Sequence, residues 1–236
     1  MTSRREEKDR RRAERLAAEQ AASEQAHRRR MYSIVVGGIL GVAAIAAVAA
    51  VALTGSSGGS SDNPKDLPAP KESYSGATSP PTQIETDLFK AADAAGCDLR
   101  NPAIEGRTHI TPDQKVKYGT NPPTSGNHDP IPATDGVYSQ APTALQIRHF
   151  VHTLEHGRIE IQYAPSLAKR RVNQLGGLFN DDPYHMVMFP NRAMPYDVAV
   201  TAWGHVLGCK KVDDKMFDAI RDFRDRYRDQ GPENVP

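Results

Sequence analysis

The fold is decided by His152-Thr153-Leu154-Glu155-His156-Gly157, together with the six residues that follow, Arg158-Ile159-Glu160-Ile161-Gln162-Tyr163. The run from Thr143 to Val151 predicts a helix, and Gly157 ends it. After the glycine, polar and apolar residues alternate, which is typical of a half-buried strand. Helices and strands that follow one another in this way predict a mixed α/β or α+β domain.

The predicted helix separates its polar from its apolar side chains. Because successive residues turn by about 100°, four polar side chains share an arc roughly 120° wide. They are His149, His152, Glu155 and His156. Four apolar side chains lie on the opposite arc: Ile147, Phe150, Val151 and Leu154. We therefore expect the apolar side to pack on a core and the other side to carry the chemistry.

The histidines of this helix have the spacing of metal ligands. His152 and His156 stand at i and i+4, so both imidazoles can reach one ion, at about 2.0–2.1 Å if it is zinc. The loop 118–135, stiffened by two prolines, holds a third histidine, His128, and a late segment holds a fourth, His205. We predict a site for zinc or copper built from His128, His152 and His156, with His205 as a fourth ligand.

Two alternatives to a binding-only metal site stay open. His-x-x-Glu-His is also the inverted zinc-peptidase pattern, in which Glu155 would be the catalytic base of a zinc-dependent hydrolase. Gly157 argues against it, because it ends the helix at once. The same residues could instead form a hydrogen-bonded structural network in a partner-binding module. Met186 and Met188 would favour copper if they were ligands, although methionines on a strand are usually core residues.

The N-terminal third predicts where the chain is located. Twenty residues without a charge, Ile34 to Leu53, are long enough to span a bilayer core of roughly 30 Å. We assign 1–30 as a charged cytoplasmic tail and 31–53 as a transmembrane signal anchor, so that the lipid bilayer is a partner through 34–53. The tail holds ten Lys or Arg residues, which places the N-terminus in the cytoplasm and the rest outside the plasma membrane. A cleaved signal peptide is the alternative, but its apolar core is usually shorter.

The remainder divides into a linker and one domain. Residues 54–83 are rich in Gly, Ser and Pro and predict a disordered tether. Residues 84–228 predict one globular extracytoplasmic domain, and 229–236 a flexible C-terminus. The whole chain carries a net charge of +1, which gives no reason to expect a nucleic-acid partner. The sequence also has no nucleotide-binding glycine motif and no serine nucleophile elbow.

Cys97 and Cys209 are the only cysteines of the chain. On the oxidising side of a membrane they predict a disulfide, with free thiols or metal ligation as the alternatives. Because the loop between them is long, the bond would stabilise the domain by on the order of 4–5 kcal/mol in chain-entropy models. We expect it to join the end of the first helix to the last strand.

Other segments of the domain give coarser predictions. Helices are expected over 87–95, 165–175 and 213–227, and strands over 186–189 and 197–207. The loop 118–135 is rich in Pro, Gly, Asn, Ser and Asp and is expected to be irregular.

Three segments carry a family resemblance. They are Thr120-Asn121-Pro122-Pro123-Thr124-Ser125-Gly126-Asn127-His128, His152 to Gly157, and Ala202-Trp203-Gly204-His205. In these motifs the chain resembles the bacterial family known as domain of unknown function 3105, whose members combine an N-terminal anchor with the same three motifs. The resemblance implies a place in the bacterial cell envelope, where another envelope protein is a candidate partner, but it implies no activity. Asn127 and Asp129 depart from the residues that members often have there.

Overall fold

The computed structural model describes residues 67–111, 113–233 and 235. The cytoplasmic tail, the anchor at 31–53 and the first part of the linker lie outside these residues. Within the described ranges, no helix is long and apolar enough to cross a membrane.

The described residues form one six-stranded sheet with four helices, which confirms the prediction of a mixed α/β fold. From one edge to the other, the strands are β1 (Cys97–Arg100), β6 (His205–Cys209), β5 (Val198–Ala202), β3 (Ile159–Tyr163), β4 (Met186–Pro190) and β2 (Gly136–Val137). Neighbours from β1 to β3 are antiparallel, whereas β3, β4 and β2 are parallel.

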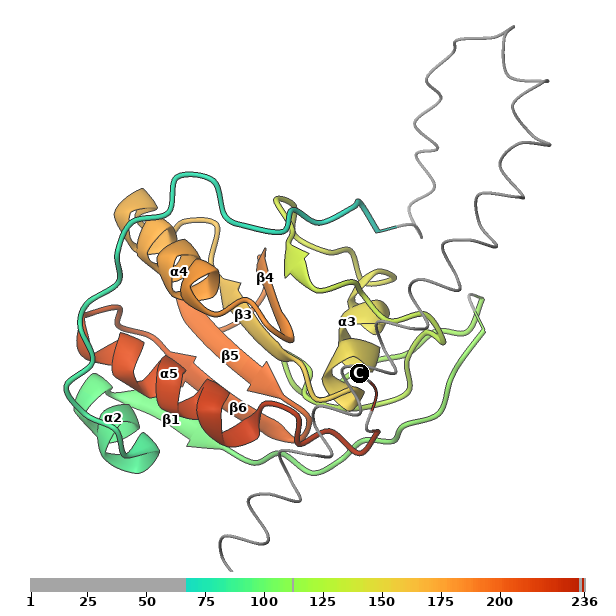
Figure 1. The fold of residues 1–236 in the computed structure, drawn as a ribbon. Coiled ribbons are helices and arrows are strands. Elements are labelled where there is room, and N and C mark those ends of the chain that lie inside the picture. The colour runs from blue at the N-terminus through green and yellow to red at the C-terminus, as the bar shows by residue number, and fades with distance from the viewer. Residues whose placement is uncertain (1–66, 112, 234, 236) are drawn as a thin grey trace, which may run out of the picture. The chain divides into compact units, whose positions relative to one another are not determined.

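Helices cover both faces of the sheet (Figure 1). They are α2 (Leu88–Ala95), α3 (Ile147–Glu155), α4 (Lys169–Asp181) and α5 (Lys215–Tyr227). The main core lies where α2, α4 and α5 pack on the side of β4 that carries Met186 and Met188. On the other side, Phe150 of α3 packs against Val187 and Phe189. Because successive side chains of a strand point to opposite faces, α3 packs on one face of the sheet and α2, α4 and α5 pack on the other.

The ends of the helices follow local sequence signals. Asp87 accepts hydrogen bonds from the amides of Phe89 and Lys90, and Gly96 takes a left-handed conformation with φ of 62°. This confirms the predicted helix over 87–95. At α3, Gly157 has φ of 79°, which glycine adopts without strain.

Several elements differ from the prediction. The segment 197–207 is not one strand, because the chain turns at Gly204 with φ of 74° and returns as β6. Strands β1 and β2 were not predicted at all. The helix expected over 165–175 occupies Lys169–Asp181 and continues through Gly176 and Gly177.

Residues 67–83, which we call the strap, belong to the folded domain rather than to a disordered linker. Lys71 exchanges two backbone hydrogen bonds with Val137 of β2, at 2.9 and 2.8 Å. Farther along, the amide of Thr78 donates to the carbonyl of Asn173 in α4 over 3.0 Å. These long-range backbone contacts correct the sequence-based boundary at residue 84.

The two glycines of α4 explain how the strap fits. A Cβ atom at Gly176 would lie 2.2 Å from the ring of Tyr74, and one at Gly177 would lie 2.1 Å from the carbonyl oxygen of Thr78. Glycine weakens an isolated helix, yet here it permits the close approach of another segment. The strap therefore lies directly on the surface of α4.

Residues 229–235, which we call the C-terminal segment, also pack on the domain. The amide of Asp229 donates to the carbonyl of Gly157 over 2.9 Å, and the amide of Glu233 donates to that of Glu155 over 3.1 Å. The guanidinium of Arg158 reaches the carbonyl of Val235. The flexible end predicted for 229–236 is thus, over its described residues, docked on the end of helix α3.

The predicted disulfide is present. Cys97 and Cys209 are bonded to each other and face one another across the antiparallel pair β1 and β6. The bond therefore joins two neighbouring strands, not a helix and a strand as expected.

Candidate metal centre

Two loop segments bring a pair of histidines together. The amide of His128 donates to the carbonyl of Thr108, and the amide of Ile110 donates to the carbonyl of His128. These bonds form an isolated parallel bridge between His109 and His128. The Gly126 amide also donates to the carbonyl of Gly106, which extends the pairing of the two loop segments. His109 consequently lies directly beside His128.

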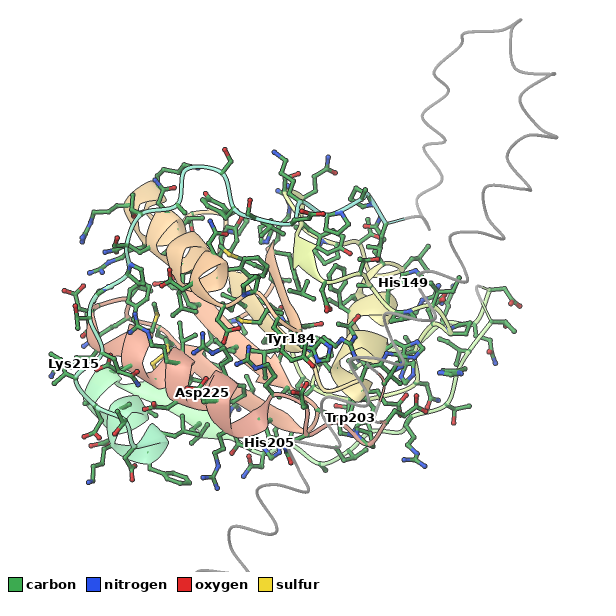
Figure 2. The ribbon with its side chains drawn as sticks, viewed as in Figure 1. His149, Tyr184, Trp203, His205, Lys215 and Asp225 are labelled. Atoms are coloured by element: carbon green, nitrogen blue, oxygen red, sulfur yellow. A yellow bond between two sulfur atoms is a disulfide. The ribbon has the colours of Figure 1, made fainter. Side chains whose placement is uncertain are left out.

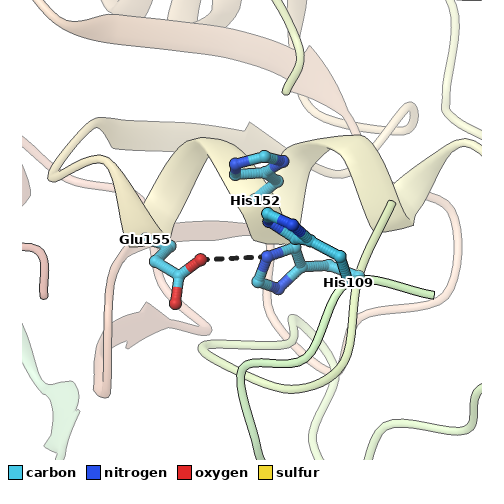
Figure 3. Close-up of side chains that lie close together, drawn as sticks. His109, His152 and Glu155 are labelled. Atoms are coloured by element: carbon cyan, nitrogen blue, oxygen red, sulfur yellow. Dashed lines mark ion pairs between the residues drawn. The ribbon is translucent and has the colours of Figure 1, made fainter. Parts of the chain in front are cut away.

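Helix α3 supplies the other half of the site. Figure 3 shows His152 and Glu155 projecting from the helix and His109 lying next to them on a loop. One ligand atom from each of His109, His128, His152 and Glu155 lies within 4.8 Å of the others. The three imidazole rings form a triangle with centroid distances of 4.7 to 5.1 Å. A His/Glu cluster that could hold a metal ion is therefore present.

Backbone carbonyls determine which nitrogen of two rings faces the cluster. His128 Nδ1 lies 2.8 Å from the carbonyl oxygen of Gly126, and His152 Nδ1 lies 2.7 Å from that of Asp129. Because a carbonyl oxygen only accepts, each Nδ1 carries the proton, and in the neutral ring Nε2 keeps its lone pair. This is the usual outer-shell arrangement of a metal-ligating histidine.

The centre of the cluster holds two buried polar atoms that face each other. His128 Nε2 and Glu155 Oε2 lie 3.0 Å apart, and their side chains are 0% and 2% exposed. They form a buried ion pair when the ring is protonated; in the neutral ring, with its proton on Nδ1, both atoms are acceptors, and neither has a hydrogen-bond partner among the described residues. An unsatisfied buried polar group costs about 1–3 kcal/mol. A cation bound between the two atoms would remove that cost.

Burial also shifts the protonation of the cluster. It lowers the pKa of His152 to about 4, an effect that the neighbouring histidines reinforce and the bond to the Asp129 carbonyl opposes. Burial raises the pKa of Glu155, while the His128 imidazole acts in the opposite direction. His152 is therefore neutral at pH 7, which is the form that ligates metals.

A second group of residues adjoins the first and shares His152 with it. His152 Nε2 lies 2.9 Å from His156 Nε2, which in turn lies 3.4 Å from Glu233 Oε2. Since His152 Nε2 is an acceptor, the proton between the rings belongs to His156. His152, His156 and Glu233 form another group whose ligand atoms lie within 4.8 Å of one another.

His205, predicted as the fourth ligand, belongs to neither group. Its ring stacks on Tyr227 of α5 with centroids 4.0 Å apart, and its Nδ1 bonds to Asn101 over 2.6 Å. Figure 2 shows His205 beside α5, whereas His149 lies at α3. Of the predicted ligands, His128 and His156 each lie with His152 but in different groups, and His205 lies in neither, so the single site predicted from all of these histidines is not formed.

The methionines considered as copper ligands lie in the core. Met186 and Met188 are fully buried in the main cluster, on the face of β4 opposite to the one that packs on α3. They are packing residues.

Two residues of the site were not predicted. His109 lies in a segment with no ligand-like spacing, and only the pairing of its segment with the His128 loop brings it to the site. Glu233 stands in the last four residues of the chain and reaches the site only because the C-terminal segment docks on α3. No local sequence signal identifies either one.

Behind the site, a buried polar network occupies the same face of the sheet. Glu160 Oε2 accepts from Gln162 and Thr201 at 3.0 and 3.1 Å, and Gln162 accepts from Asn191. Among the described residues, Glu160 Oε1 has no hydrogen-bond partner. Burial raises the pKa of this carboxyl well above its usual range, although both hydrogen bonds oppose the shift. Burial thus favours the neutral form of the Glu160 carboxyl, which links strands β3 and β5 through its hydrogen bond to Thr201.

Comparisons with known proteins identify the family to which the chain belongs. No curated protein and no solved structure matches the chain. A family model described as "Protein of unknown function (DUF3105)" matches residues 109–236, more than half of the chain. The matched span begins at His109 and contains every residue of the two groups. This confirms the resemblance inferred from the sequence motifs, and the chain belongs to the DUF3105 family of proteins of unknown function.

Proposed function

We propose that this domain binds one divalent transition-metal ion through His109, His128, His152 and Glu155. The observation that carries the proposal is the orientation of two buried rings: the Nδ1 atoms of His128 and His152 donate to backbone carbonyls, so each ring presents an Nε2 lone pair. That of His128 faces Glu155, and that of His152 accepts from His156 in the metal-free protein, a hydrogen bond that a bound ion would replace. Two buried atoms of the group, His128 Nε2 and Glu155 Oε2, face each other 3.0 Å apart, and neither has a hydrogen-bond partner among the described residues. With the neutral His128 ring both atoms are acceptors, which a cation between them would satisfy.

The chemistry of the ligands narrows the choice of ion. Imidazole suits zinc and copper, whereas Cu⁺ prefers thiolate and thioether ligands. The group contains neither, because the methionines lie in the core and both cysteines are in the disulfide. We therefore propose Zn²⁺ or Cu²⁺, held by three nitrogens and one carboxylate.

The position of Glu155 favours binding over hydrolysis. In the inverted peptidase pattern the glutamate must be free to take a proton from the metal-bound water. Here its carboxylate is one of the four grouped ligands and lies 3.0 Å from His128 Nε2. His109 is the exposed member of the group and gives the site its access to solvent.

We place this site outside the cell. The proposed anchor at 34–53 and the basic residues before it support this location. The disulfide adds support, since such bonds persist in oxidising compartments. The domain would then bind its ion at the cell envelope, near the bilayer and any envelope partner protein.

Elemental analysis of the purified full chain tests the proposal. After incubation with Zn²⁺ or Cu²⁺ and removal of excess ion, the wild type should retain one equivalent. His128→Ala and Glu155→Gln should weaken binding about tenfold or more, because each removes a ligand. His185→Ala is the matched control, since His185 bonds to Asp229 outside the four-ligand group and should leave binding unchanged. A wild type that retains no ion, or an effect of the control equal to that of His128→Ala, would refute the proposal.

A further inference from the structure

We propose that the bound ion has a second position, held by His152, His156 and Glu233. The inference rests on the proposed metal function of the four-ligand group, which we call the inner position; the group with Glu233 is the outer position. His152 belongs to both. The two positions are therefore alternatives for one ion, which moves between them while His152 stays bound.

The outer position has the geometry of a ligand set. One ligand atom from each of His152, His156 and Glu233 lies within 4.8 Å of the others, and His156 Nε2 lies 2.9 Å from His152 Nε2 and 3.4 Å from Glu233 Oε2. An ion bound here would displace the proton that lies between the two rings. Two imidazoles and a carboxylate also form a common three-ligand zinc site. In both positions the ligand types are the same, so an ion that suits one position suits the other.

The outer position is more open to solvent on the side of the C-terminal segment. The side chains of His156 and Glu233 are 12% and 45% exposed, against 0% and 2% for His128 and Glu155 in the inner position. An ion at the outer position is therefore open to solvent ligands on the Glu233 side, whereas an ion at the inner position is open to them at His109, the exposed member of that group.

A single nitrogen prevents both positions from being filled together. His152 Nδ1 donates to the Asp129 carbonyl over 2.7 Å, so only Nε2 is available to a metal. One imidazole lone pair binds one ion. Two ligand groups thus predict one equivalent of metal per chain, not two.

Backbone contacts keep Glu233 at the site. The Glu233 amide is bonded to the carbonyl of Glu155, a residue of the inner position, over 3.1 Å. An ion that moves inward exchanges His156 and Glu233 for His109, His128 and Glu155, and it never leaves His152. The C-terminal segment acts in this way as the loading side of the site.

Metal titration of the full chain tests the inference, with Zn²⁺ as the probe and a competing chelator to set the free ion concentration. Four proteins are compared: the wild type, His128→Ala, Glu233→Gln and the double variant. The wild type should bind one equivalent. His128→Ala should still bind one equivalent, with affinity lowered about tenfold or more, and adding Glu233→Gln should lower it about tenfold again. Glu233→Gln alone should leave the wild-type affinity nearly unchanged but slow the transfer of Zn²⁺ to the chelator.

The matched control is Asp229→Asn in the His128→Ala background, because Asp229 is in the same segment but bonds to His185 outside both groups. It should have no effect. If His128→Ala fails to fold, as judged by circular dichroism, Glu155→Gln replaces it as the variant that disrupts the inner position. Two tight equivalents in the wild type would overturn the exchange of one ion between the two positions, and equal affinities of the single and double variants would overturn the outer position; both results would leave the inner position intact. A loss of all wild-type binding would instead refute the proposed function itself.

Discussion

The backbone amide of Glu233 donates a hydrogen bond to the carbonyl oxygen of Glu155, so the end of the chain caps the last turn of the helix that carries the site. The last carbonyls of a helix have no partner within it and need one from elsewhere. Here the C-terminal segment supplies that partner and at the same time brings the Glu233 carboxylate to His156. Stability and the outer metal position therefore depend on the same few residues.

Truncation after Gln230 should destabilise the metal-free domain by about 1–3 kcal/mol. The deletion removes the bonds from Glu233 to the Glu155 carbonyl and from Arg158 to the Val235 carbonyl, each worth roughly 0.5–1.5 kcal/mol. Urea unfolding of the full chain measures this. Glu233→Gln is the control, because it keeps the backbone bond and should change stability by less than about 0.5 kcal/mol. An unchanged midpoint after truncation would contradict the docking of the segment.

Gly176→Ala should destabilise the protein, although the same change in an exposed helix stabilises by about 1 kcal/mol. The new Cβ would lie 2.2 Å from the Tyr74 ring, and overpacking of this kind typically costs 1–3 kcal/mol. In a Tyr74→Ala background the penalty should fall by about half or more, since the ring atoms that clash are gone. Thermal and urea unfolding of the four variants measure this coupling. Additive effects would show that the strap does not press on α4.

Glu160→Gln should change how stability depends on pH. Because burial raises the pKa of Glu160 in the folded state, the folded protein binds more protons than the unfolded chain above pH of about 4.5. Below that pH the free energy of unfolding of the wild type does not depend on the ionisation of this group. As pH rises toward the folded pKa of Glu160, the free energy of unfolding falls by up to about 1.4 kcal/mol per pH unit. Glutamine resembles the neutral carboxyl group and does not ionise, so Glu160→Gln should not lose stability in this way as pH rises.

The measurement is urea unfolding of metal-free wild type and Glu160→Gln from pH 4.5 to 8. The variant should gain stability relative to the wild type steadily with pH. A difference that is constant with pH would mean that Glu160 is ionised in the folded protein.

Reduction of the disulfide should lower the free energy of unfolding by about 2–5 kcal/mol. The bond connects residues 112 positions apart, so it removes much conformational freedom from the unfolded chain. Unfolding with and without reductant measures the loss, and Cys97→Ser/Cys209→Ser should match the reduced wild type and ignore the reductant. A wild type indifferent to reductant would contradict the expected stabilisation.

The sequence predicts those parts of the fold that depend on local signals. Asp87 and Gly96 define helix α2 at both ends, and polar alternation identifies β3. The strands β1 and β2 have four and two residues and exist through pairing with distant partners, so no local pattern identifies them. Gly176 and Gly177 argue against a helix in isolation; contacts with the strap, invisible in the local sequence, explain why α4 continues through them.

The part of the site that lies on helix α3 could be predicted, because it also depends on local sequence signals. Helical spacing places His152, Glu155 and His156 on one arc, which explains why His152 lies near both Glu155 and His156, although these two belong to different ligand groups. His109 and Glu233 join them through backbone bonds between segments that are far apart in the chain. The prediction of His205 as a ligand was wrong, because it rested on the motif that contains this residue. The chain turns at Gly204, and His205 stacks on Tyr227 of α5, away from the cluster.

The strap has a consequence for how copies of this protein meet. At one edge of the sheet, Lys71 already occupies the outer backbone groups of Val137. At the other, β1 is only four residues long and exposes the charged residues Asp98 and Arg100. Short, charged or covered edges resist the addition of a strand from another molecule. Even when crowded together on one surface, neighbouring domains would find no long open ladder on which to aggregate.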